Sequence, residues 1–250
     1  MGSSKRVEGT SALKAVLFDA GNTLIYMPRS PEEMLQEVCR QWGVPISPEA
    51  ARGACRQAER YYARHYLGYR GDQGEFWRRF HAEALRHLGI DDPGGDRSNH
   101  LSHVFGRDGV WVAYPEAADV CRQLRSAGLK LGVVSNGSTN TGDLLSQSGL
   151  LPFFDVVVAS QEVGVQKPDP RIFAVALKRL GVLPPETLFV GDLYDVDILG
   201  ALAAGISAVL IDRERRRARV DCPVIGNLEE LIPLAIDVAS EGREPRADCP

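Results

Sequence analysis

Four places in the sequence carry side chains whose types and positions could support phosphoryl chemistry. Each follows a short apolar run or comes just before a helix start, and the residues are Asp19, Ser135 with Asn136, Lys167, and Asp192 with Asp197. Carboxylates suit a hard cation such as Mg²⁺, and a lysine ammonium suits a phosphate oxygen. Together these residue types indicate a site where a phosphoryl group is held beside a divalent metal ion.

Asp19 is the residue of this set that could attack a phosphoryl group. Taken alone it could equally cap a turn, but the three further stretches favour a site. An ionised carboxylate is repelled by a phosphate dianion, by about 4 kcal/mol for each pair of unit charges at about 4 Å and an effective dielectric constant near 20. One metal ion and the ammonium of Lys167 can offset this repulsion. Asp19 could then form an aspartyl-phosphate that water hydrolyses.

The elements that must position these residues alternate between strands and helices. Short apolar runs typical of buried strands cover residues 16–18, 129–135, 154–159, 187–190 and 207–211. Helical spacing fills the intervals after the second run, and a last helix is expected over residues 227–239. This alternation predicts an α/β fold, with a Rossmann-like parallel sheet covered by helices on both faces. Ligands of such sheets bind at the carboxyl ends of the strands, where these polar residues fall.

Residues 27–112 interrupt the alternation after the first strand. Helical spacing and helix starts predict helices over about residues 31–43, 47–68, 72–88 and a shorter one ending near 105. The sequence predicts no convincing strand between residues 27 and 109, and it predicts an irregular flap over residues 24–30. We therefore expect a core domain of residues 13–26 and 113–240 and an all-helical cap domain of residues 27–112. Residues 1–12 and 241–250 are expected to be flexible tails.

The composition narrows the class of protein. The chain has 250 residues, 44% of them apolar, and a net charge of −4, which does not suggest a nucleic-acid or membrane-surface partner. No apolar run is long enough for a membrane span, and no signal peptide opens the sequence. The five cysteines are scattered, without a CxxC pair, so a cytoplasmic location is expected. No oligomeric state is predicted.

The four stretches resemble, in order and spacing, the motifs of the haloacid dehalogenase-like superfamily, whose members are mostly Mg²⁺-dependent phosphatases. The corresponding segments are residues 18–24, 134–137, 167–170 and 191–197, and the resemblance spans about residues 14–212. It implies a phosphatase that acts on a small phosphorylated metabolite.

The resemblance also implies roles for individual residues. It makes Asp19 the catalytic nucleophile and assigns the Mg²⁺ site to Asp19, the Gly21 carbonyl, Asp192 and Asp197, the last directly or through water. It assigns phosphate and substrate binding to Ser135, Asn136 and Lys167, with Lys167 also catalytic. Thr23 is expected to brace the first loop through its hydroxyl, and Asp195 to be a solvated turn residue.

The sequence departs from the family at Gly21, where typical phosphatases carry a second Asp that protonates the leaving oxygen. General acid–base catalysis contributes about 10²–10⁴ in rate, so the omission is large. The following residue is Asn22, and asparagine tolerates the positive φ of such a turn. Three hypotheses stay open: a good leaving group such as an acyl phosphate, a proton donor from the cap, or a different reaction.

The cap holds all five histidines, which are the candidate donors of the second hypothesis: His65, His81, His87, His100 and His103. Under the third hypothesis the protein is a 2-haloacid dehalogenase, because halide leaves without a proton, although Asp192 keeps the metal-binding Gly–Asp that dehalogenases lack. A low-activity regulatory or binding relative is a further alternative. The arginines at positions 52, 56, 60 and 64 predict a solvated helix face, and residues 213–219 an exposed basic turn.

Overall fold

The chain folds into two compact units in a computed structural model that describes residues 12–66, 69, 72–108, 111–137, 139–214 and 220–241. One unit comprises Met27–Val112, and the other comprises Met1–Tyr26 with Ala113–Pro250. Most of the predicted tails, residues 1–11 and 242–250, lies outside the described residues.

The larger unit is built on a sheet of six parallel strands in the order β5-β4-β1-β6-β7-β8. The strands are β1 (Ala15–Phe18), β4 (Lys130–Ser135), β5 (Val156–Ala159), β6 (Thr187–Gly191), β7 (Ser207–Ile211) and β8 (Val224–Ile225). Every residue of β1 and β6 is buried, as expected for strands covered on both faces. The strand with the first chemistry-bearing residue therefore lies inside the sheet, between β4 and β6.

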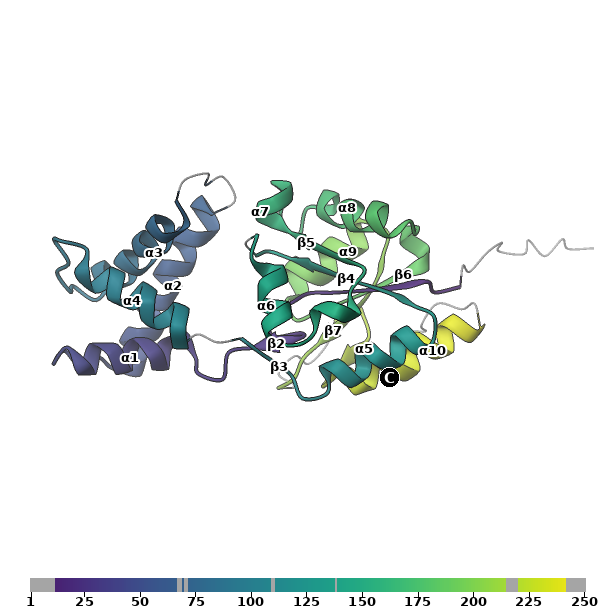
Figure 1. The fold of residues 1–250 in the computed structure, drawn as a ribbon, viewed down its shortest axis with the longest axis horizontal. Helices are drawn as coiled ribbons and strands as arrows, with labels where there is room; N and C mark the ends of the chain where they lie inside the picture. The colour runs from purple at the N-terminus through teal and green to yellow at the C-terminus, as the bar shows by residue number, and fades with distance from the viewer. Residues whose placement is uncertain are drawn as a thin grey trace, which may run out of the picture. The chain divides into compact units, whose positions relative to one another are not determined.

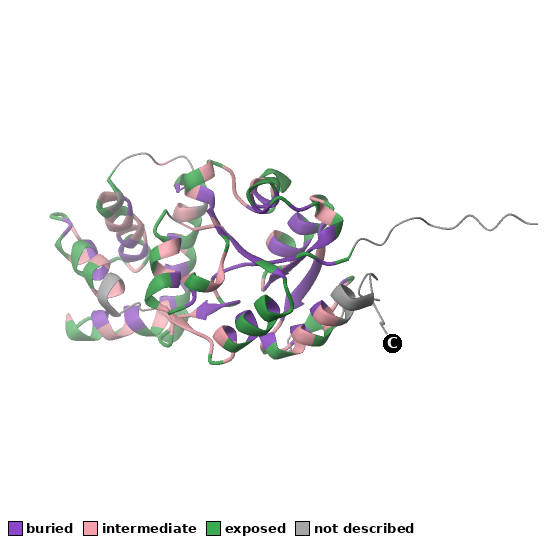
Figure 2. Ribbon diagram, turned by 45° about the vertical axis from the view of Figure 1, so that its right-hand side comes forward, coloured by how far each residue is buried: buried purple, intermediate pink, exposed green. Residues whose placement is uncertain are grey.

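Helices cover both faces of this sheet. They are α5 (Ala117–Ser126), α6 (Thr141–Gln147), α7 (Ser160–Val163), α8 (Pro170–Leu180), α9 (Leu199–Ala203) and α10 (Leu231–Glu241), with one π-helical turn, η3 (Tyr194–Ile198). In Figure 1, α5 and α10 lie side by side on one face of the sheet, and α8 and α9 lie on the other. Figure 2 shows the buried sheet between helices whose outer surfaces are exposed. The α/β, Rossmann-like fold expected from the sequence is confirmed.

Helix α8 illustrates how the sequence sets an element that carries the site. The side chain of Asp169 accepts a hydrogen bond from the Arg171 amide, Pro170 occupies the first turn, and Gly181 ends the helix in the left-handed conformation at φ 65°. Between these ends, five apolar side chains are buried: Ile172, Phe173, Ala176, Leu177 and Leu180. The helix start that follows Lys167 is thus fixed at the edge of the core.

The smaller unit is a cluster of four helices, as predicted. They are α1 (Pro31–Gln41), α2 (Pro48–His65), α3 (Gln73–His87) and α4 (Asp96–Asp108). Ser30, Ser47 and Asp72 cap the first three, and Ser30 forms a reciprocal capping box with Glu33. The core between the helices is apolar and includes Leu35, Val38, Ala58, Leu85 and Leu101. The four arginines at positions 52, 56, 60 and 64 are exposed, which confirms the predicted solvated face of α2.

Three short strands were not expected. The strand β2 (Ile25–Tyr26), in the segment predicted as an irregular flap, pairs with β3 (Val112–Ala113), and β8 extends the main sheet beyond the predicted last strand. Two-residue strands carry no measurable periodicity, so their pairing comes from the fold rather than from local pattern. The β2–β3 pair stands where the chain passes from one unit to the other.

Two further observations bear on the predicted class of protein. Among the described residues, no helix combines the length and the apolar content that crossing a membrane requires. Cys39, Cys55, Cys121 and Cys222 are buried free thiols.

His81 is a buried titratable group in the helical unit. It lies on α3 with 5% of its surface exposed, and its Nδ1 is 3.0 Å from the Ser102 hydroxyl oxygen. That hydroxyl donates to the Ser98 carbonyl, so the ring donates from Nδ1 and leaves Nε2 unprotonated. Nε2 has no hydrogen-bond partner among the described residues. Burial lowers the pKa of His81 to about 4.

Because of His81, we expect the helical unit to become less stable as the pH is lowered. The unfolded chain takes up this proton near pH 6.5, whereas the folded unit takes it up only near pH 4. Stability is therefore complete above about pH 6.5 and declines as the pH falls toward 4, with a loss of about 2 kcal/mol between about pH 7 and pH 5. All three tryptophans lie in residues 27–112, so their fluorescence during urea titration reports unfolding of this unit.

Two variants isolate the contribution of this ring. His81→Gln removes the buried titrating group and should flatten the pH dependence, whereas His103→Gln changes an exposed histidine and should preserve it. A His81→Gln protein that still loses about 2 kcal/mol over the same pH range would contradict the assignment.

Candidate active site

Three neighbouring strands bring the polar residues of the motifs to one edge of the sheet. Asp19 follows β1, Ser135 ends β4, and Asp192 follows β6. Successive strands extend the sheet on the β4 side of β1 and then on the β6 side, so the strand order reverses beside β1. Ligand sites of open α/β sheets lie at such a reversal. The Asp19 amide donates to the Val190 carbonyl at 2.8 Å, which ties the segment after β1 to β6.

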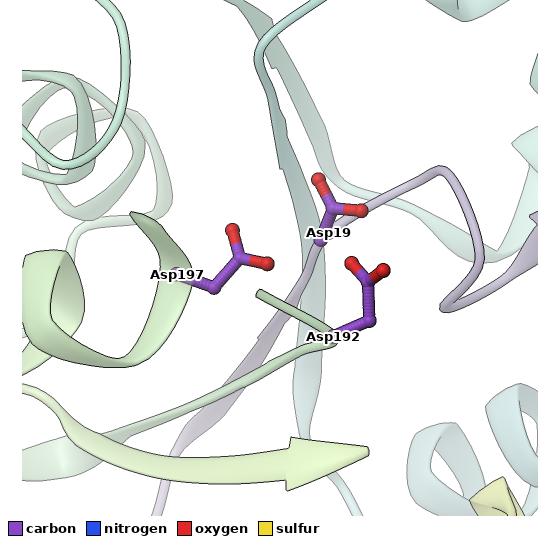
Figure 3. Close-up of side chains that lie close together, drawn as sticks. All are labelled: Asp19, Asp192 and Asp197. Atoms are coloured by element: carbon purple, nitrogen blue, oxygen red, sulfur yellow. The ribbon is translucent and has the colours of Figure 1, made fainter. Parts of the chain in front are cut away.

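Asp19, Asp192 and Asp197 form a carboxylate cluster. One oxygen of each lies within 4.8 Å of the others, and Figure 3 shows the three side chains gathered around one point. Asp197 reaches the cluster from η3, where its Oδ2 accepts a hydrogen bond of 2.9 Å from the Leu193 amide. A side chain at Gly191 would place its Cβ 2.6 Å from the carboxyl group of Asp197. Glycine at the end of β6 is therefore required for Asp197 to lie here.

Lys167 is the cation of this cluster. Its Nζ lies 2.5 Å from Asp19 Oδ1 and 2.7 Å from Asp197 Oδ1, and its side chain is 1% exposed. Burial would lower the pKa of Lys167, but the two carboxylates outweigh it and raise the pKa. The ammonium is therefore charged and shared between two acidic side chains. Removing one partner of such a buried ion pair strongly destabilises the folded protein, because the other charge stays buried without compensation.

Asn136 holds Lys167 through its backbone. The amide nitrogen of the Asn136 side chain donates to the Lys167 carbonyl at 2.9 Å, and its oxygen accepts from the Lys167 amide at 2.7 Å. This pair of bonds joins the second and third motifs, which are 31 residues apart. The predicted substrate contact of Asn136 stays a prediction, whereas its positioning of Lys167 is an observed role that the sequence did not reveal.

Three carboxylates face a single ammonium in this cluster. Burial, together with repulsion from Asp197 and Asp192 and against the attraction of Lys167, raises the pKa of Asp19 to about 7. Burial and the repulsion from Asp197 raise the pKa of Asp192 to about 6, against the attraction of Lys167. The negative charge is therefore not fully compensated by the protein. A divalent cation bound by these carboxylates would compensate it.

The loop after Asp19 turns sharply at Asn22. Its φ of 55° makes Asn22 the one described non-glycine residue in the left-handed region, as the sequence predicted for this turn. The side chain of Asn22 also interacts with the Asp192 carboxyl group and lowers its pKa, which brings this loop close to the end of β6. The expectation for Thr23 is wrong, because its hydroxyl is buried and has no partner among the described residues.

Ser135 and Thr141 bring two hydroxyl groups to the second motif. Ser135 is 8% exposed and Thr141 3%. A Cβ on Gly137 would lie 3.1 Å from Ser135 Oγ and 2.6 Å from Thr141 Oγ1, so glycine leaves room for both hydroxyls. Thr141, in the first turn of α6, was not singled out from the sequence. The signal was available as a hydroxyl residue in the first helical turn after the Ser–Asn–Gly segment.

The donor set fits a hard divalent cation. Asp19, Asp192 and Asp197 offer carboxylate oxygens from three segments, and the cluster contains no sulfur or imidazole. This chemistry suits Mg²⁺ better than a softer metal. The predicted site residues Asp19, Lys167, Asp192 and Asp197 thus meet in one place, and Asn136 supports them. Asp195 is exposed, as predicted for a turn residue. The catalytic, metal-binding and substrate-binding roles of these residues, and of Gly21 and Ser135, stay predictions.

Comparison with known proteins agrees with this arrangement. The family described as haloacid dehalogenase-like hydrolase matches residues 13–205. A glyceraldehyde 3-phosphate phosphatase from Methanopyrus kandleri is 34% identical over 203 residues, which cover 80% of this chain and 84% of that protein.

Two solved structures are also similar. A phosphatase of this superfamily from Thermococcus onnurineus is 31% identical with a TM-score of 0.58, over 88% of this chain and 96% of that one. A crystal structure described as a dehalogenase is 28% identical with a TM-score of 0.67, over 89% and 96%. The family match covers most of the chain and includes all four motifs. The chain therefore belongs to the haloacid dehalogenase-like hydrolases.

Proposed function

We propose that the protein is a Mg²⁺-dependent phosphatase that hydrolyses a small phosphorylated metabolite, with Asp19 as nucleophile. The observation that carries this proposal is the cluster of Asp19, Asp192 and Asp197, in which Asp19 and Asp197 pair with the buried ammonium of Lys167. A bound metal ion would compensate the negative charge of the carboxylates, so that a phosphate group could bind beside them. The similarity to a glyceraldehyde 3-phosphate phosphatase supports this substrate class without fixing the substrate.

In the proposed reaction, a carboxylate oxygen of Asp19 attacks phosphorus. The bond between phosphorus and the leaving oxygen breaks, and an aspartyl-phosphate forms. Water then attacks the same phosphorus and releases inorganic phosphate and the Asp19 carboxylate. Lys167 favours the ionised form of Asp19, against the burial that raises its pKa, and places positive charge beside the phosphate oxygens, where Ser135 supplies a hydroxyl.

Mg²⁺ would be held by Asp19, Asp192 and Asp197, with the Gly21 carbonyl as a further ligand. When bound, it supplies positive charge that stabilises phosphate oxygens during attack. Asn22 lies beside Asp192 and favours its ionised form, the form that binds a metal ion. Buried free thiols support the proposal that the enzyme works in the cytoplasm.

Gly21 leaves the proposed reaction without the usual proton donor in the first loop. The buried His81, whose pKa is about 4, is neutral at pH 7 and belongs to the interior of the helical unit, so it is a poor candidate for that role. Because Gly21 removes the donor from its usual place, we favour a substrate whose leaving group departs without strong acid help, such as an acyl phosphate; the other four histidines of the cap stay candidates under the second hypothesis.

Dehalogenation of a 2-haloacid is the second candidate function. Gly21 favours it because halide needs no proton, and the similarity to a structure described as a dehalogenase supports it. Asp192 and the uncompensated carboxylates argue for a metal and hence for phosphate. Release of halide from 2-chloropropionate without added Mg²⁺ would favour the second candidate over the first.

Asp19→Asn should abolish phosphate release from 4-nitrophenyl phosphate. The amide cannot attack phosphorus, so we expect kcat to fall by more than about 10³-fold. Asp195→Asn is the matched control, because it makes the same change at an exposed acid of the fourth motif and should leave kcat within about twofold of wild type. Circular dichroism verifies folding, and a fully active Asp19→Asn variant would end the proposal.

Removal of Mg²⁺ should also stop phosphate release. After chelation with EDTA we expect activity to return with added Mg²⁺, and Asp192→Asn should raise the Mg²⁺ concentration for half-maximal activity by about 10–100-fold. Isothermal titration calorimetry with MgCl₂ measures the same loss of Mg²⁺ affinity in the absence of substrate. Full activity in EDTA would exclude a metal-dependent mechanism.

The identity of the leaving group should control the rate strongly. Without an acid at position 21, we expect kcat/KM for phenyl phosphate to be about 10²-fold or more below that for 4-nitrophenyl phosphate. Acetyl phosphate should be hydrolysed faster than a simple alkyl phosphate. Similar rates for all four compounds would show that another residue supplies the proton and would restore the hypothesis of a donor from the cap.

A further inference from the structure

Arg213 occupies an unexpected position in the core unit. It stands two residues after β7, in the segment that the sequence predicted to be an exposed basic turn. Its side chain is only 18% exposed, so the prediction is wrong for this residue, while residues 215–219 lie outside the described part of the chain. A guanidinium that is largely buried must have partners, and those partners identify its role.

Two of these partners are carbonyl groups of the loop that follows Asp19. Nη2 of Arg213 donates to the Thr23 carbonyl at 2.8 Å, and Nε donates to the Asn22 carbonyl at 3.3 Å. These carbonyls lie 190 and 191 residues away in the sequence. Arg213 thus holds the backbone of the sharp turn at Asn22, whose side chain interacts with Asp192.

The third partner fixes the guanidinium itself. Nη1 donates to Glu116 Oε1 at 2.7 Å, and the Glu116 side chain is only 14% exposed. The same carboxylate oxygen accepts from the Leu228 amide at 3.4 Å. The planar fork of arginine serves three acceptors at once, which the single ammonium of lysine cannot do in the same directions.

The guanidinium also covers an aromatic pair. Its Cζ lies 3.3 Å from the centroid of the Tyr114 ring, and this ring stacks on Tyr26 at 4.5 Å. Tyr26 and Tyr114 stand in the core unit at the two places where the chain leaves for residues 27–112 and returns. Arg213 therefore connects the first loop to Tyr114 and, through the stacked rings, to Tyr26.

We propose that Arg213 is a positioning residue that fixes the loop after Asp19, and through it Asn22 and Asp192, in the arrangement that the reaction needs. This inference rests on the proposed function for its effect on catalysis, but its structural part concerns the loop alone. A displacement of about 1 Å at a reacting group lowers a rate by as much as about 10²-fold. We therefore expect Arg213 to act on kcat rather than on substrate binding.

Hydrogen exchange of the loop amides tests the structural part without any substrate. The amides of Asn22, Leu24 and Ile25 donate to backbone carbonyls within the loop. In Arg213→Ala we expect their protection to fall by about tenfold or more, while the amides of β4 keep theirs. Arg213→Lys retains a cation over Tyr114 and should lose an intermediate amount.

Arg179→Ala is the matched control. Arg179 also joins a carboxylate, Glu162 at 2.8 Å, and a carbonyl, that of Val157 at 3.4 Å, in the same unit. Its removal should leave exchange in the first loop and kcat unchanged. This control separates the loss of any arginine ion pair from the loss of this one.

Kinetics test the catalytic part. For Arg213→Ala we expect kcat with 4-nitrophenyl phosphate to fall by about 10–100-fold with KM within about threefold, and added guanidinium to restore part of it. If Arg213→Ala does not fold, hydrogen exchange and kinetics of Arg213→Lys decide.

Unchanged protection of the loop amides overturns the proposal whether or not the wild type is a phosphatase. Unchanged kcat in an active enzyme overturns it as well. A wild type without phosphatase activity but with the expected exchange pattern would reject only the proposed function.

Discussion

The structure depends on one electrostatic constraint: three neighbouring carboxylates, two of them buried, face a single buried ammonium. Lys167 bridges Asp19 and Asp197, while Asp192 completes the cluster, and the described residues place no second cation in it. Charges that are removed from water interact several times more strongly than in water, so a divalent cation bound here would compensate the excess negative charge. Under the proposed function, the metal ion would compensate the carboxylates and the phosphate would use the remaining positive charge.

Several neighbouring features exist to hold these charges in place. Gly191 admits the side chain of Asp197, and the single π-helical turn carries Asp197 to the cluster. Asn136, which directly follows β4, fixes the backbone of Lys167. Arg213 binds the carbonyl groups of Asn22 and Thr23. The arrangement of the site therefore depends on residues outside the carboxylate cluster as well as on the cluster itself.

The family and the site together restrict the chemistry, while Gly21 distinguishes this chain within it. The proposed hydrolysis through Asp19 needs an ionised carboxylate, which Lys167 and a bound metal would favour. The leaving group would then be protonated by a residue outside the first loop, or would leave without a proton. The same scaffold carries phosphatases and a dehalogenase among its relatives, so the fold alone does not separate the two reactions.

The sequence by itself determined the parallel sheet, the capped helices and the residues that gather at the strand ends, because these follow from local periodicity, helix caps and the order of motifs. It did not determine β2, β3 or β8, which are too short to show a pattern. Nor did it reveal that Asn136 serves Lys167, that the Thr23 hydroxyl is unpartnered among the described residues, or that Arg213 is buried against the first loop. Only the tertiary structure decided these, because the partners lie tens to nearly two hundred residues apart and meet only when the strands are side by side.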